Sequence, residues 1–177
     1  AMIKPLKSLT KAQFNKLPNN EKRVLLAQDV IAQIKAKKYV QNHGDYIQFH
    51  KKKAKNVTNK VFREELNEQF EHISLMFDRQ VVSEKFSNLS AKYCIDSMDQ
   101  CHVCAKGAVI CSFVQNFNKR KIKDINAEDS EIKEIFGDEL WSAIEIQFED
   151  EDKSLLSLMQ NIVKNNGYLK IGGELIG

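Results

Sequence analysis

The chain is poor in the residues that interrupt secondary structure. Its 177 residues contain two prolines and seven glycines, and four of those glycines come after residue 160. Sandwiches and barrels need turn residues about every 8–12 positions, so this scarcity favours helices. The sequence therefore predicts a mainly α fold, a compact bundle of about six or seven helices with at most a small two-stranded β element.

Long apolar runs are lacking as well. The longest, such as residues 108–111, are far shorter than the roughly 20 residues that span a bilayer. The first residues contain no apolar segment like that of a secretory signal peptide. With four cysteines and no export signal, we expect a cytoplasmic protein with reduced thiols and no membrane partner.

Motifs of the common enzyme classes are absent from the sequence. It has no G-x-S-x-G, no P-loop, no dinucleotide fingerprint and no H-E-x-x-H. None of the four histidines forms a recognised motif with a nucleophile partner. The sequence therefore favours a non-enzymatic role, although a site assembled from distant residues would leave no motif.

Charge is divided unevenly along what the length predicts to be a single globular domain, residues 2–177. Residues 1–123 hold 23 lysines and arginines against 11 acidic residues, whereas residues 124–177 hold 4 against 13. The basic part would face nucleic acid or an acidic partner, or the two parts would neutralise each other within one fold. The glycine-rich tail, residues 172–177, is expected to be frayed.

Periodic patterns predict the main elements. Apolar residues spaced by three and four predict a strong helix over residues 20–38, and residues 101–117 are predicted to form another. The acidic run 149–152 is predicted to begin the last helix, where the helix dipole favours negative charge. Short strand patterns cover residues 46–50 and 168–171, and their pairing would supply the small β element.

All four cysteines lie between Cys94 and Cys111, and Cys101 and Cys104 have the C-x-x-C spacing of zinc and dithiol sites. A zinc site would use Cys94, Cys101 and Cys104 with a distant histidine. Cys111 is excluded because, in a helix, it lies about 10.5 Å from Cys104 along the axis. Dithiol redox chemistry is a second hypothesis, although the polar residues before Cys101 do not resemble a buried strand.

Core packing is the favoured interpretation of the cysteines. Cys101, Cys104, Ala108 and Cys111 would form one continuous stripe on a helix. A free cysteine behaves as a small hydrophobic side chain and is among the most frequently buried residue types. This interpretation predicts slowly reacting thiols and no cofactor, with zinc as the alternative.

Two basic segments are candidates for nucleic-acid binding. Non-specific binding to phosphates needs little more than clustered positive charge. No helix-turn-helix, RNP or zinc-finger pattern accompanies these segments. The candidate phosphate contacts are Lys51, Lys52, Lys53, Lys55, Lys119, Arg120, Lys121 and Lys123.

Three features together resemble small uncharacterised proteins of phages, prophages and plasmids. They are a helix followed by Gly44-Asp45-Tyr46, the C-x-x-C-A-x-G-A segment at residues 101–108, and N-I-V-x-N-x-G at residues 161–167. The resemblance implies an accessory protein of a mobile element or its host, without a known activity.

The functional prediction is therefore an accessory protein that binds a macromolecule. A host protein is favoured over nucleic acid because clustered positive charge is the only sequence feature that favours nucleic acid. A homo-oligomer is a further expectation, and a small zinc or thiol protein is the third class of function.

Overall fold

The computed structural model describes residues 4–43, 45–49, 74–76, 80–81, 90–96, 100–117, 120–121, 124 and 130–177. Helices predominate, which confirms the prediction of a mainly α fold. The helices are η1 (Leu6–Ser8, a 3-10 helix), α1 (Lys11–Asn15), α2 (Asn19–Lys35), α5 (Ala91–Asp96), α6 (Ala105–Phe117), α7 (Ser130–Phe136), α8 (Asp138–Glu149) and α9 (Leu155–Lys164). The strands are β1 (Tyr39–Gln41), β2 (Asp45–Phe49), β3 (Ser74–Met76), β4 (Gln80–Val81), β5 (Cys101–Val103), β6 (Leu169–Ile171) and β7 (Glu174–Ile176). Within these described ranges, no helix is long and apolar enough to cross a membrane.

Five strands form a mixed sheet in the order β1-β5-β2-β3-β4, so the predicted limit of a two-stranded β element is wrong. Strand β5 pairs in parallel with β1 and antiparallel with β2. Cys101 and Val103 are buried while His102 between them is half-buried, which is the alternation of a strand. The helix predicted over residues 101–117 therefore begins only at Ala105.

Helix α2 occupies the centre of the molecule and contacts α6, α7 and α9. Its residues Leu25, Leu26 and Val30 are fully buried. The helix ends earlier than the predicted residue 38, because Lys37 adopts a left-handed conformation with φ of 61°. The N–H of Lys38 then donates to the carbonyl of Gln33 at 2.9 Å, as in a Schellman C-cap.

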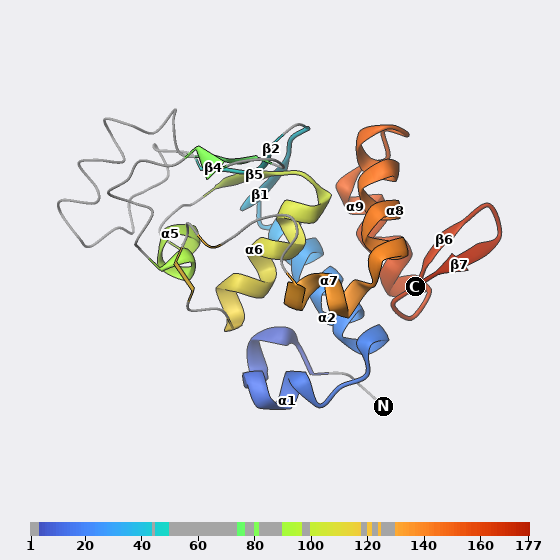
Figure 1. Cartoon of the computed structure of the whole chain (residues 1–177), viewed down its shortest axis with the longest axis horizontal. Helices are drawn as coiled ribbons and strands as arrows, with labels where there is room; N and C mark the ends of the chain where they lie inside the picture. The colour runs from blue at the N-terminus through green and yellow to red at the C-terminus, as the bar shows by residue number, and fades with distance from the viewer. Residues whose placement is uncertain are drawn as a thin grey trace.

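The C-terminal part packs on one side of α6, away from α5 (Figure 1). The strand predicted at residues 168–171 pairs with β7 and not with residues 46–50. Gly172 and Gly173 both have positive φ, which a two-residue hairpin turn requires. The tail that was expected to be frayed is therefore the second strand of a hairpin.

The acidic run does not begin the last helix. Glu149 is the last residue of α8, and α9 begins at Leu155. Ser154 is the N-cap of α9, and its hydroxyl accepts a hydrogen bond from the N–H of Ser157 at 3.1 Å. A serine side chain that satisfies a free N–H group defines this helix start more strongly than the preceding charge does.

One buried guanidinium joins three helices. Arg23 of α2 is 7% exposed, and its Nε donates to the carbonyl oxygen of Ile135 at 2.8 Å. A second nitrogen donates to the carbonyl oxygen of Gly167 at 3.3 Å. These carbonyls lie at the C-terminal ends of α7 and α9, where the helix dipoles favour a cation. Arg23 thus fixes both helices against α2.

Replacing Arg23 with methionine tests this junction. Arg23→Met keeps an apolar stem but leaves two buried carbonyls without their donor, so we expect the free energy of unfolding to fall by about 2–4 kcal/mol. Denaturant unfolding would measure the loss. Lys35→Met, at the exposed C-terminal turn of the same helix, is the matched control and should change stability little.

A second close contact holds the end of α9 against the start of α2. The N–H of Gly167 donates to the carbonyl of Ile162 at 2.8 Å, which completes a Schellman motif with Asn166 in the left-handed region. Gly167 itself has a φ of 94°, and a methyl group there would overlap the backbone carbonyl of Asn20. This position therefore requires glycine for two separate reasons.

Alanine substitutions at two glycines distinguish the strain of a positive φ from the clash with the Asn20 backbone. Gly167→Ala adds both conformational strain and a clash with backbone, and should lower the free energy of unfolding by roughly 2–5 kcal/mol. Gly172→Ala meets open space at a φ of 57°, so it should show the strain alone, about 1–2 kcal/mol. Equal losses in thermal or denaturant unfolding would contradict the close approach.

Candidate functional site

The predicted zinc ligands do not form a metal site in the described part of the chain. Cys101 lies in β5 and Cys104 at the residue before α6, and both thiols are buried. Cys94 belongs to α5, and its side chain lies outside the described residues. Among the described side chains, no group of three or more metal-ligating residues is placed to hold an ion.

Burial makes the described thiols poor nucleophiles. The thiol of Cys104 accepts a hydrogen bond from the N–H of Gly107 at 3.4 Å, a contact that favours the thiolate. Loss of solvent outweighs this contact and raises the pKa of Cys104 to about 12. Burial raises the pKa of Cys111 well above its ordinary value too, and its thiol contacts that of Cys101. Cys101, Cys104 and Cys111 pack in the core as predicted, although Cys101 does so from a strand and not from a helical stripe.

Thiol reactivity measures this burial directly. Cys94→Ser removes the cysteine whose side chain is outside the described residues. With a pKa of about 12, the Cys104 thiolate is about one in ten thousand molecules at pH 8. We expect the native variant to react with Ellman's reagent at least about a hundredfold more slowly than the denatured variant. Rapid reaction of one thiol in the native protein would contradict the account.

The predicted basic segments are only partly described. Lys51, Lys52, Lys53, Lys55, Lys119 and Lys123 lie outside the described residues. Arg120 and Lys121 lie beside the start of α5, where the N–H of Ala91 donates to the carbonyl of Arg120 at 2.7 Å. Lys121 forms an isolated bridge with Ser90 and is exposed.

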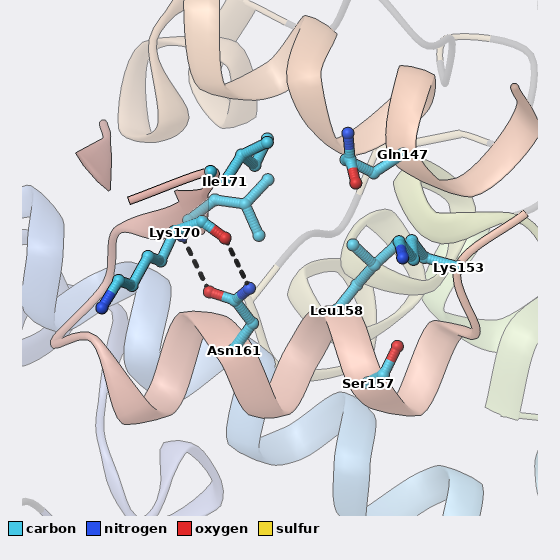
Figure 2. Close-up of a pocket in the computed structure, with 9 residues that line it drawn as sticks. Gln147, Lys153, Ser157, Leu158, Asn161, Lys170 and Ile171 are labelled. Carbon is cyan, nitrogen blue, oxygen red and sulfur yellow. Dashed lines mark hydrogen bonds between the residues drawn. The ribbon is translucent and has the colours of Figure 1, made fainter. Parts of the chain in front are cut away.

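A cavity of about 360 Å³ lies between α8, α9 and β6, and we call it the lysine pocket (Figure 2). Residues from all three elements surround it, with Gln147 on the opposite side from Ser157 and Asn161, while the Lys170 side chain extends away from Gln147 and Lys153. The size falls within the range of pockets that bind small ligands or single side chains. Its lining residues are Gln147, Lys153, Ser157, Leu158, Asn161, Leu169, Lys170, Ile171 and Gly172.

Asn161 fixes one wall of the lysine pocket. Its side-chain amide donates to the carbonyl of Lys170 at 2.9 Å, and its amide oxygen accepts from the N–H of Lys170 at 2.8 Å (Figure 2). These two bonds imitate the pairing of a neighbouring strand. They hold β6 against α9. They also use the N–H and C=O groups of Lys170 on the outer edge of β6. The backbone that carries the Lys170 side chain is therefore fixed beside the cavity.

Two lysines line the lysine pocket although this part of the chain is mainly acidic. Residues 124–177 contain four lysines and no arginine against 13 acidic residues. Lys133 pairs with Asp138 at 3.7 Å, whereas Lys153 and Lys170 are exposed and pair with no carboxylate of the described residues. Two ammonium groups thus remain available at one cavity although carboxylates are abundant nearby.

Comparison with known proteins gives no further guide. No family model, no curated protein and no solved structure matches this chain. The likeness to phage and plasmid proteins therefore rests on the three sequence features alone.

Sequence reasoning missed the lysine pocket. Lys153 precedes α9, Ser157 lies within it, and Lys170 follows it in β6, so no local motif connects them. The one available signal was compositional, because most lysines of the acidic part line this region. That signal has meaning only after the helix and the hairpin are placed side by side.

Proposed function

We propose that this protein acts by binding another macromolecule, and that its partner is a protein that presents acidic side chains to the lysine pocket. The observation that carries the proposal is the pair of unpaired lysines at one cavity in an otherwise acidic part of the chain. An incoming carboxylate would gain ion pairs without displacing a carboxylate of the chain itself. Its aliphatic stem would lie on the apolar floor of Leu158, Leu169 and Ile171.

The lining residues favour a protein over nucleic acid. They include no arginine, which recognises phosphate in a bidentate manner, and no aromatic ring on which a base would stack. Leu175 is 58% exposed and lies opposite Lys170 in the hairpin, so an apolar contact adjoins the cation. Acidic and apolar groups together are typical of a protein surface.

The same lining favours binding over catalysis. Neither a histidine nor a carboxylate lines the cavity, so Ser157 has no general base there. Its hydroxyl donates to the carbonyl of Ser154 at 3.0 Å and serves the helix cap. The association with a phage or mobile element stays a prediction, in which the acidic partner would be a host protein.

Binding of an acidic peptide tests the proposal. A fluorescein-labelled peptide of alternating glutamate and alanine would be titrated with the protein and followed by fluorescence anisotropy. We expect Lys153→Ala and Lys170→Ala each to weaken binding about two- to fivefold, and the double variant to weaken it further. Added salt should weaken binding to the unmodified protein.

Lys133→Ala is the matched control, since it removes one positive charge from the same part of the chain but from a lysine paired with Asp138. It should leave peptide affinity unchanged. Equal affinity of all variants would contradict the proposal. Binding of a single-stranded oligonucleotide in place of the peptide, with loss in the Lys153 and Lys170 variants, would replace the protein partner by nucleic acid.

A further inference from the structure

The lysine pocket has a neighbour on the same helix. A second cavity, of about 280 Å³, shares Ser157, Asn161 and Lys170 with the first. Its other lining residues are Gln160, Lys164 and Asn165. Lys164 is exposed and, like the other two lysines, pairs with no carboxylate of the described residues. Three of the four lysines in residues 124–177 therefore surround two adjoining cavities.

The two cavities follow the axis of α9. Ser157 and Lys164 are seven residues apart on the helix, which corresponds to about 10.5 Å along its axis. Helix α9 rises about 13.5 Å from Leu155 to Lys164, and Lys153 precedes it, so the backbones of the two outer lysines are separated by about 13.5 Å or slightly more along this direction. Lys170 lies between them, on the wall that both cavities share.

This inference rests on the proposed function and specifies the partner. We propose that the partner segment lies along α9 in an extended conformation and carries two carboxylates, one for each cavity. One carboxylate would pair with Lys153 and the other with Lys164, while Lys170 contributes to both. Asn161 lies beneath the part of the segment that connects the two.

Spacing decides which acidic pair fits. In an extended segment, side chains two residues apart are separated by about 6.6 Å and those four apart by about 13 Å, on the same face. The shorter spacing does not span the cavities, whereas the longer one matches the separation of the two outer lysines along α9. In a helix, four residues span only about 6 Å and seven only about 10.5 Å, so helical pairs on one face fall short of this separation. The favoured motif is therefore Glu-x-x-x-Glu in an extended segment.

The recognition uses side chains and not strand pairing with β6. Asn161 already bonds both the N–H and the C=O of Lys170 on the outer edge of that strand. A partner backbone has no free group there with which to extend the sheet. Affinity should therefore depend on the positions of the two carboxylates and on salt.

A series of peptides tests the spacing. Labelled serine- and threonine-rich peptides would carry one glutamate, or two glutamates separated by two, four or seven positions, and be titrated by anisotropy. We expect the four-position peptide to bind at least about fivefold more tightly than the one-glutamate peptide. Lys164→Ala should remove that advantage while weakening the one-glutamate peptide by about twofold at most, and Lys133→Ala should change neither.

The outcomes separate this inference from the proposed function. If peptide binding needs Lys153 and Lys170 but is indifferent to Lys164 and to the second glutamate, the two-site inference is wrong and the proposed function stands. An optimum at seven positions would overturn the extended conformation. If no peptide responds to Lys153 or Lys170, both fail. Unchanged thermal unfolding of the Lys164 variant would establish that a loss of binding does not come from misfolding.

Discussion

The packing of α9 against α2 is the contact on which the candidate site depends. Gly167 approaches the backbone of Asn20 more closely than any side chain would permit, and Arg23 reaches the carbonyl of the same glycine. These contacts fix where α9 ends and therefore where the chain turns back into β6. Asn161 then fastens β6 to the helix from the other side. Both cavities are consequences of this one junction.

The lysines around α9 form no ion pairs that would stabilise the described fold. Some lysines elsewhere in the described chain form ion pairs, as does the buried Lys106, whose ammonium lies 2.9 Å from a carboxylate oxygen of Glu145. Around α9, three lysines stay unpaired although acidic residues outnumber them in this part of the sequence. Exposed like charges on one face repel one another weakly when they lie about a Debye length or more apart. Such a local conflict is what a binding surface is expected to show.

The predictability of the fold differed between its elements. The helix signal of α2 was readable, because the spacing of its apolar residues is a local property of the sequence. Strand β5 could not be predicted from the sequence. It has only three residues, and its conformation depends on pairing with β1 and β2, which are distant in the sequence. Small residues after Cys104 favour a helix, and the prediction extended that helix back over Cys101. The lysine pocket could not be predicted either, because its two cations, Lys153 and Lys170, come from separate segments of the chain.

The most direct test of the central claim is to map the contact of an acidic peptide on the protein by NMR. Titration of ¹⁵N-labelled protein with a Glu-x-x-x-Glu peptide should shift the amide signals of Ser157, Asn161 and Lys170, at both cavities, and leave those of α5 and β1 in place. Shifts concentrated near Arg120 and Lys121, with none along α9, would contradict the account.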